Sequence, residues 1–326
     1  MLPSPTRFLA FLLVLTGLTA GCTSQPADPL RVGLNPWPGY DFLYLAQQKG
    51  FIAEEGGRVE IVGFTSVGDS RRAFERGQVD AFGGTTVELL RARANARNQP
   101  RAFAVTNWSE GADQILARPG IETMADLAGK RVAVEPASVD LLVLAVALDR
   151  AGLAPDAVER VTMAQAEMAD AMAEGRVQAA VSYPPASVHI RNRSAARPVF
   201  DTAQAPRAVL DLFIGSETAL RQRPEDFTAL VRAFDRAVRY AEANPEESRR
   251  IMARREGIQP EALRRALSRI RVMDLADQRD MWGPEGAVRS AVARTALALH
   301  RADHIDEPGD TDGLVTASVV ERASSP

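Results

Sequence analysis

The sequence predicts an α/β protein with two similar lobes, each a mainly parallel sheet flanked by helices, joined by two crossover strands. Three observations predict this fold. A strand–helix–strand–helix–strand pattern occurs twice, the two copies match about one hundred residues apart, and strand-like segments connect them. Alternating strands and helices favour parallel sheets with helices on their faces.

The repeat is visible in the residues themselves. RVGLNP at 31–36 aligns with RVAVEP at 131–136, and FERGQVDA at 74–81 aligns with MAEGRVQA at 172–179. Between these landmarks, VEIV at 59–62 corresponds to VERV at 158–161. Self-similarity at a constant offset identifies equivalent structural units, so each copy is predicted to form one βαβαβ unit.

The elements of the two units follow from apolar periodicity and from glycines that end helices. The glycines Gly50, Gly77, Gly152 and Gly175 follow apolar residues at helical spacing. The predicted strands are 31–35, 59–64 and 79–83 in the first unit and 131–135, 158–163 and 177–181 in the second. The predicted helices are 41–49 and 67–76, and 139–151 and 164–174.

Further segments complete the lobes. Strand-like residues 100–108 and 113–119 lie between the units, and 196–201 and 209–216 follow the second. Helices are predicted at 227–241, from Pro245 with Asn244 as N-cap, at about 260–271 and at 284–301. We therefore assign residues 30–112 plus 213–305 to lobe one and 113–212 to lobe two. Residues 306–326, rich in Asp, Gly, Ser and Pro, are predicted to be a flexible tail.

The N-terminus predicts the cellular location. Arg7 precedes the apolar run 8–18, which has the length of a signal-peptide core and is short for a permanent membrane helix. The following LTAGC at 18–22 resembles a bacterial lipoprotein signal, although Thr19 is weaker than the usual residue there. We predict that residues 1–22 are the signal and anchor, with Cys22 lipidated, and that 23–29 are a tether. This places the protein on the periplasmic side of the cell envelope; the alternative is an ordinary secretory signal.

Composition and motifs exclude several functions. A net charge of −3 gives no basic field for nucleic acid. Cys22 is the only cysteine, and His189, His300 and His304 are the only histidines. No GxSxG, Walker or GxGxxG motif follows a predicted strand. The sequence therefore predicts a protein that is not an enzyme, with no catalytic residue, metal or cofactor.

Candidate ligand contacts lie where strands end and helices begin, because ligands of open α/β sheets bind there. Helix starts at Ser66, Thr85, Thr86 and Ser138 offer hydroxyls and backbone N–H groups to an anionic or polar ligand. The alternative is that these hydroxyls serve only as N-caps. Trp37 can provide an aromatic wall, or can simply pack in the core.

Three carboxylates affect which ligand charge the cleft is expected to accept. Asp113 is expected to tie the crossover segment rather than to bind ligand. Glu135 and Asp140 would oppose a bare anion if they faced the cleft.

Several segments in order carry a family resemblance. NPWPGYDFLYLAQQKGFIAEEGGRVEIVGF, GQVDAFGGTTVELL, NWSEGADQILARPGIETMADLAGKRVAVEP and DLLVLAVALDRAGL resemble the substrate-binding proteins of ABC importers of the nitrate, sulfonate, taurine and thiamine-pyrimidine group. The resemblance implies a monomeric, two-lobed periplasmic-binding-protein fold that closes on one small molecule and presents it to permease and ATPase subunits. It departs at Ser182-Tyr183-Pro184, where many relatives have Trp-Glu-Pro, so a carboxylate expected there is absent.

Together the strand-end turns and the resemblance give one set of ligand-binding candidates: Trp37, Gly39, Tyr40, Ser66, Gly84, Thr85, Thr86, Trp108, Ser138 and Tyr183. Helix starts and hydroxyls favour a small organic acid, sulfonate-like as the first choice. The aromatic residues leave a pyrimidine precursor of thiamine as the second. A further alternative is a ligand-sensing lipoprotein that signals to a membrane kinase or cyclase.

Overall fold

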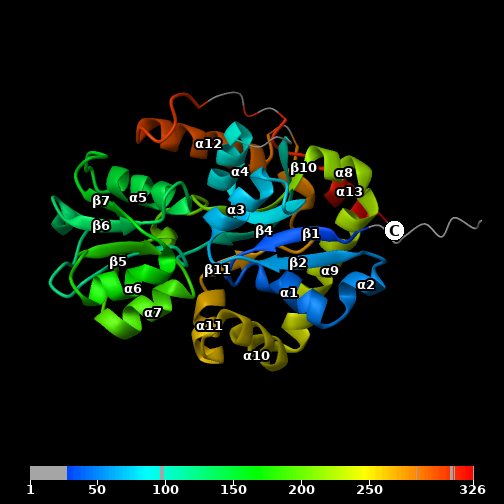
Figure 1. Cartoon of the computed structure of the whole chain (residues 1–326), viewed down its shortest axis with the longest axis horizontal. Helices are drawn as coiled ribbons and strands as arrows, with labels where there is room; N and C mark the ends of the chain where they lie inside the picture. The colour runs from blue at the N-terminus through cyan, green and yellow to red at the C-terminus, as the bar shows by residue number, and fades with distance from the viewer. Residues whose placement is uncertain (1–27, 96–98, 284, 309–310, 312, 326) are drawn as a thin grey trace, which may run out of the picture.

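The computed structural model describes residues 28–95, 99–283, 285–308, 311 and 313–325. The predicted signal, Cys22 and residues 23–27 of the tether lie outside the described residues. Two sheets, each covered by helices, form two lobes that lie side by side (Figure 1). No helix in the described ranges has the length and apolar character needed to span a membrane.

The first lobe contains a six-stranded sheet in the order β11-β4-β10-β3-β1-β2. Strands β2, β1 and β3 are parallel, whereas β10 runs antiparallel to both β3 and β4, and β11 antiparallel to β4. The bounds are β1 (Leu30–Leu34), β2 (Val59–Gly63), β3 (Ala81–Thr85), β4 (Pro100–Ser109), β10 (Leu210–Ser216) and β11 (Ile270–Val272).

The second lobe contains a five-stranded sheet in the order β7-β6-β8-β5-β9. Strands β7, β6 and β8 are parallel, and β5 is antiparallel to β8 and β9. The bounds are β5 (Gln114–Ala117), β6 (Arg131–Val134), β7 (Glu159–Thr162), β8 (Ala179–Ser182) and β9 (Arg197–Asp201).

Both sheets are therefore mixed, whereas the sequence predicted mainly parallel sheets. The crossover connections are the reason. The chain passes from β4 directly into β5, and from β9 into β10. A segment that enters a lobe from the lobe boundary must run outward, against the parallel strands that run toward that boundary. This accounts for the antiparallel direction of β5 and β10.

The predicted repeat is confirmed in strand order, register and side-chain contacts. Val32 of β1 lies opposite Ala81, as Val132 of β6 lies opposite Ala179. Arg31 and Arg131, which begin the matched segments, donate through Nη2 to the carbonyls of Gly77 and Gly175, at 3.2 and 3.1 Å. Both glycines have left-handed backbones, with φ of 71° and 76°. The two units thus share the details of a turn as well as their topology.

The four helices predicted in the two units are present, and further helices that the sequence did not predict accompany them. The first unit contains α1 (Asp41–Gln48), α2 (Phe51–Glu54), α3 (Val67–Glu75) and α4 (Thr86–Asn95), and the second α5 (Val139–Arg150), α6 (Gln165–Ala173) and α7 (Ala186–Ser194). The C-terminal helices are α8 (Glu217–Gln222), α9 (Pro224–Ala243), α10 (Pro245–Glu256), α11 (Pro260–Leu267), α12 (Ala287–Arg301) and α13 (Ser318–Ser324). Three 3-10 turns complete the elements: η1 (Ala125–Leu127), η2 (Thr202–Gln204) and η3 (Arg279–Met281).

Two details of the predicted helices are wrong. The helix expected over 260–271 ends at Leu267, because Ile270 and Val272 pair with the edge of β4 as β11. Asn244 does not cap α10 with its side chain; its Nδ2 instead donates to the carbonyl of Tyr240 at 3.1 Å.

The predicted flexible tail is also wrong over its last part. Residues 318–324 form α13, whose Val319 and Val320 are buried against the apolar core. Arg232 of α9 donates to the carbonyls of Ala323 and Ser325, which satisfies the free carbonyls at the end of α13. Burial of Val319, Val320 and Ala323 therefore orders a segment whose average composition is polar.

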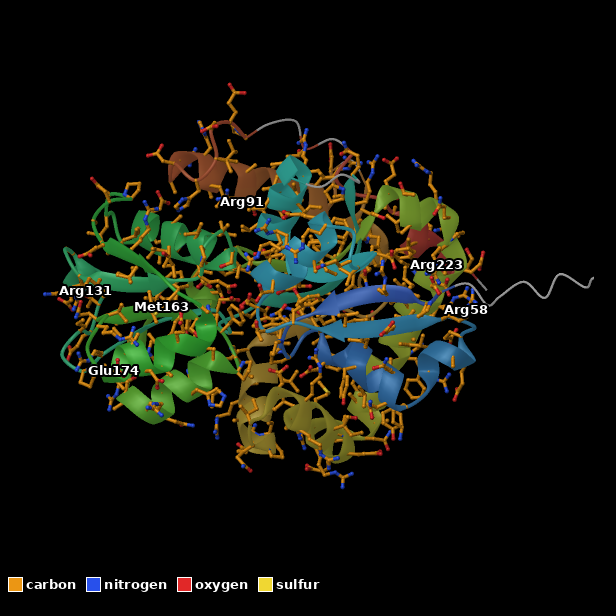
Figure 2. All side chains as sticks on the ribbon, viewed as in Figure 1. Arg58, Arg91, Arg131, Met163, Glu174 and Arg223 are labelled. Carbon is orange, nitrogen blue, oxygen red and sulfur yellow. The ribbon has the colours of Figure 1, made fainter. Side chains whose placement is uncertain are left out.

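The strand directions place the functional surface between the lobes. Arg131 begins β6 and Arg58 directly precedes β2, and these residues lie at opposite outer ends of the molecule (Figure 2). The carboxyl ends of the parallel strands in both lobes therefore face the lobe boundary, where ligands of such sheets bind.

Candidate functional site between the lobes

A small cavity lies at the lobe boundary, at the ends of β1, β3 and β8. Its volume is about 20 Å³, which accommodates about one water molecule. The lining residues come from both lobes and from the first crossover: Asn35, Trp37, Tyr40, Val67, Thr85, Asp113, Val139, Tyr183 and Asp211. Side chains of the two lobes thus approach each other closely at this cavity.

Aromatic residues from both lobes meet at this cavity. The rings of Trp37 and Tyr183 are 5.8 Å apart and nearly perpendicular, at 85°. Trp37 Nε1 donates to Asn107 Oδ1 at 3.1 Å, and the Tyr40 hydroxyl donates to Asp211 Oδ1 at 2.9 Å. The structure therefore brings three of the predicted aromatic residues together, and each of them makes a buried hydrogen bond.

Two predicted glycines support the site without lining it. A Cβ on Gly39 would stand 1.8 Å from Asn107 Oδ1 and 2.6 Å from Trp37 Nε1. A Cβ on Gly84 would stand 2.7 Å from the Phe82 ring. Gly39 thus leaves the space in which the bond between Trp37 and Asn107 forms.

Glu88 of lobe one reaches the first turn of α5 in lobe two. Its Oε1 accepts from the backbone N–H of Val139 at 3.0 Å. Its Oε2 accepts from the backbone N–H and the hydroxyl of Thr85, at 2.8 and 2.5 Å. A protein carboxylate therefore occupies the N-terminus of α5, where a bound anion would gain most.

Glu135 of lobe two makes the reciprocal contact with α3 in lobe one. Its Oε1 lies 3.1 Å from the position that a Cβ on Gly68 would take. Its Oε2 accepts from the Tyr183 hydroxyl at 3.3 Å. Burial raises the pKa of Glu135, and contacts with the Ser66 hydroxyl and the Gly68 backbone partly offset that rise. Each lobe therefore supplies a carboxylate to a helix start of the other.

The remaining predicted residues lie beside the cavity. Ser66 caps α3 by accepting from Asp69 N at 3.1 Å, and Ser138 caps α5 by accepting from Asp140 N at 3.3 Å. The Thr86 hydroxyl bonds that of Thr295 at 2.7 Å, which joins α4 to α12. Trp108 is buried in β4, opposite Leu210. Of the four predicted hydroxyls, only Thr85 lines the cavity.

Acidic groups dominate the charge of the site. Asp113 is 3% exposed, and burial raises its pKa from 3.8 to about 6. Burial also raises the pKa values of Asp211 and Asp140 well above the usual range, with neighbouring carboxylates adding to the effect. None of the described residues that line the cavity is Lys or Arg.

The sequence did not identify Asn35 and Asp211 as site residues. Asp211 is a single acid inside the apolar strand VLDLFIG at 209–215, and a buried acid in such a strand is a usable signal. Asn35 follows β1 directly at the strand end, two residues before Trp37.

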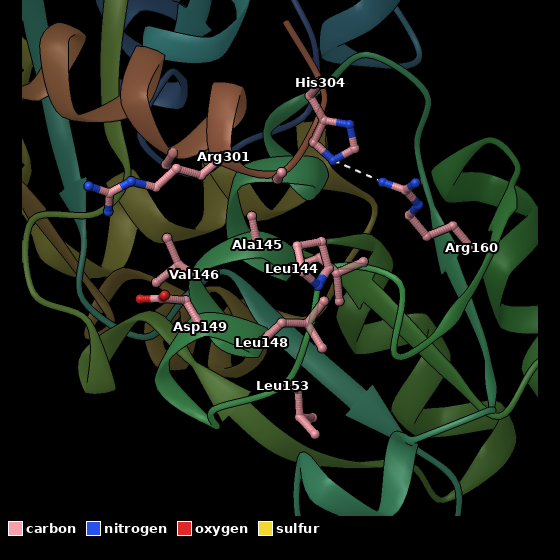
Figure 3. Close-up of a pocket in the computed structure, with 12 residues that line it drawn as sticks. Leu144, Ala145, Val146, Leu148, Asp149, Leu153, Arg160, Arg301 and His304 are labelled. Atoms are coloured by element: carbon pink, nitrogen blue, oxygen red, sulfur yellow. Dashed lines mark hydrogen bonds between the residues drawn. The ribbon is translucent and has the colours of Figure 1, made fainter.

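A larger cavity of about 150 Å³ lies away from the strand ends, between α5 and α12 (Figure 3). Apolar side chains such as Leu144, Leu148 and Leu153 line it, and Arg160 Nη1 lies 3.1 Å from His304 Nε2 at its rim. In the described part of the chain, no group of three or more His, Cys, Asp or Glu residues is arranged to hold a metal ion. Of these two cavities, the one at the ends of β1, β3 and β8 has more polar lining residues and is the better candidate for a polar solute.

Sequence comparison identifies the family. The profile of the family described as "NMT1/THI5 like" matches residues 37–248. The chain belongs to this family. A protein of Brucella abortus (strain 2308) named as a binding protein is 27% identical over 258 residues, which cover 76% of this chain and 77% of that protein.

Solved structures share the fold at low sequence identity. The alkanesulfonate-binding protein SsuA from Xanthomonas axonopodis pv. citri, bound to MOPS, has a TM-score of 0.74 at 21% identity, covering 89% of this chain and 99% of that one. The ligand-binding component of an ABC-type import system from Staphylococcus aureus has a TM-score of 0.76 at 16% identity, covering 91% and 99%. The desulfurization enzyme DSZB also shares the fold, with a TM-score of 0.64 at 19% identity, covering 91% and 98%. The chain thus has the two-lobed periplasmic-binding-protein fold, on which both binding and catalysis occur.

Proposed function

We propose that this protein is the solute-binding component of an ABC importer. It captures one small organic solute between its lobes on the periplasmic side of the bacterial envelope and delivers it to the permease and ATPase subunits. The observation that carries this proposal is the cavity at the facing strand ends, lined by side chains of both lobes. We further propose that Cys22 anchors the monomeric protein to the membrane through lipid.

Ligand capture is proposed to proceed by lobe closure. The two connections, residues 110–113 between β4 and β5 and residues 202–209 between β9 and β10, would act as the hinge between lobes at 30–112 plus 213–305 and at 113–212. A solute bound to one lobe gains contacts from the other only when the lobes meet, so binding shifts the population toward the closed form. The permease would recognise that form.

We propose that Trp37, Tyr40, Thr85 and Tyr183 contact the solute, since they line the cavity. Asn35, Asp113 and Asp211 join them. Of the other predicted residues, Gly39 leaves room for the bond that holds Trp37, whereas Ser66, Gly84, Thr86, Trp108 and Ser138 make the contacts described above and do not line the cavity.

The ligand class favoured by the sequence is not supported by the charge of the site. The sequence predicts a sulfonate-like acid because helix starts and hydroxyls attract anions. In the structure Glu88 and Glu135 stand at the starts of α5 and α3. A pyrimidine-like ring remains compatible with the aromatic walls. We propose binding without chemical transformation, because no GxSxG, Walker or GxGxxG motif follows a predicted strand.

Small-angle scattering after a thermal-shift screen tests the proposal. The screen would cover sulfonates, nitrate, pyrimidines and small organic cations, because a tight ligand raises apparent stability by mass action. A solute that raises the melting temperature is expected to reduce the radius of gyration as well. A stabilising solute that leaves the scattering profile unchanged would contradict closure of the lobes on the ligand.

A further inference from the structure

Resting on the proposed function, we infer that the solute is a small organic cation, an amidinium, guanidinium or protonated amine with a planar or apolar body. The inference combines the acceptors left unpaired at the cavity, the aromatic residues around them and the filling of both helix starts by protein carboxylates.

Two buried oxygen acceptors at the cavity have no partner in the described structure. Asp113 Oδ2 and Asn35 Oδ1 accept no hydrogen bond, although their residues are only 3% and 2% exposed. Both residues line the cavity. A buried acceptor without a donor is unfavourable, so a ligand that brings N–H groups would complete both.

One of the two acceptors can carry a negative charge, and a cationic ligand could pair with it. The Asn35 side chain is neutral, whereas Asp113 carries a negative charge when ionised. Asp211, on the same cavity, already accepts from the Tyr40 hydroxyl and from Asn107 Nδ2, at 2.9 and 2.8 Å. The Ser109 side chain bonds the Asp113 carboxyl, but Oδ2 of this carboxyl has no donor, so Asp113 is the carboxylate left to pair with a ligand charge.

The walls of the cavity favour a cation with a flat or apolar body. Trp37, Tyr40 and Tyr183 line it, and a cation gains from the faces of such rings. The same rings pack against a planar or alkyl portion of the ligand.

The anion-binding positions of the cleft are already filled. Glu88 bonds Val139 N at the start of α5, and Glu135 approaches Gly68 at the start of α3. A sulfonate at either position would have to displace a carboxylate that the opposite lobe supplies. A cation faces no such competition, and it can pair with Asp113 when that carboxyl is ionised.

Calorimetric titration with three matched probes tests the inference. Benzamidinium, benzamide and benzenesulfonate share one ring and differ in charge. Benzamidinium is expected to bind most tightly. Asp113→Asn is expected to weaken benzamidinium binding by at least about 30-fold, because truncating one partner of a buried charge pair has effects of this size. Asp226→Asn, which changes a buried aspartate of α9 outside the cavity, should leave binding unchanged.

The pH dependence gives a second readout that mere damage to the fold would not reproduce. Burial raises the pKa of Asp113 to about 6, and the nearby charge of Glu88 adds to this. Glu88, Asp140, Asp211 and Tyr183 are the other titratable groups around this carboxyl. Benzamidinium binding should weaken between pH 7.5 and 5.5 in the wild type as Asp113 takes up a proton, and should change less in Asp113→Asn.

The outcomes separate this inference from the proposed function. Tighter binding of benzenesulfonate than of benzamidinium, with compaction in scattering, would overturn the inference of a cationic ligand. The proposed solute-binding function would still stand. Equal affinities for benzamidinium and benzamide would show that charge is not recognised and would also overturn it. Absence of compaction with every solute that binds would count against the proposed function itself.

Discussion

Replacing Asp113 by asparagine is expected to stabilise the folded protein at neutral pH. Burial raises the pKa of this carboxyl from 3.8 to about 6. Each pKa unit corresponds to about 1.4 kcal/mol, so the buried charge lowers the free energy of unfolding by about 3 kcal/mol once it is ionised. Asparagine keeps the size and one acceptor of the side chain and never carries the charge.

The direction of the Asp113 pKa shift determines the pH range in which the substitution changes the free energy of unfolding. Because the pKa is higher in the folded state, the protonated carboxyl favours folding fully below about pH 4, and this contribution is lost as the pH rises through 6. The variant and the wild type should therefore have similar free energies of unfolding near pH 4. The difference should grow to about 3 kcal/mol by pH 7.5.

Urea unfolding at pH 4.5, 6.0 and 7.5 measures this difference. Asp226→Asn serves as a matched control: Asp226 accepts from Arg58 N at 2.8 Å and from Arg223, so its replacement should destabilise the protein. A gain from Asp113→Asn that is the same at every pH, or a loss at pH 7.5, would refute the reasoning. Confirmation would mean that the buried Asp113 carboxylate lowers the stability of the folded protein, as functional groups in binding sites often do.

Three further changes have defined outcomes. Trp37→Ala should abolish the ligand-induced rise in melting temperature without unfolding the protein, and an undiminished rise would remove Trp37 from the site. Gly39→Ala places a Cβ 1.8 Å from Asn107 Oδ1 and should lower the free energy of unfolding by about 1–3 kcal/mol, whereas Gly63→Ala, with open space, should change it little. Val319→Ala should lower the free energy of unfolding in urea by about 1–3 kcal/mol if α13 packs as described. A change near zero would instead support the flexible tail that the sequence predicts.

The repeat made most of the fold predictable from the sequence. RVGLNP and RVAVEP fixed the first strand of each unit, and the glycines after the helices fixed their ends. Antiparallel directions were harder to predict, because local periodicity identifies a strand and carries no information on its direction. The same limit explains β11: only pairing with β4 makes a strand of Ile270–Val272 at the end of a helical segment.

The aromatic residues of the candidate site were predictable from the sequence, whereas most of its acidic residues were not. Trp37 and Tyr40 follow a strand end in a repeated unit, which is a local signal. Asp211 comes from β10, distant in sequence, and reaches the cavity only through pairing of β10 with β3. The partners that fill the helix starts, Glu88 and Glu135, come from opposite lobes. Such contacts depend on how the lobes meet, and no single segment encodes this.

The most direct test of binding between the lobes is to identify a solute that the protein retains. The wild type and Trp37→Ala would each be incubated with the small-molecule fraction of a bacterial extract, washed and denatured, and the released molecules would be measured by mass spectrometry. One solute, positively charged at neutral pH, should be enriched with the wild type and absent with Trp37→Ala. Equal recovery from both proteins, or no enriched solute at all, would contradict a ligand site at the cavity between the lobes.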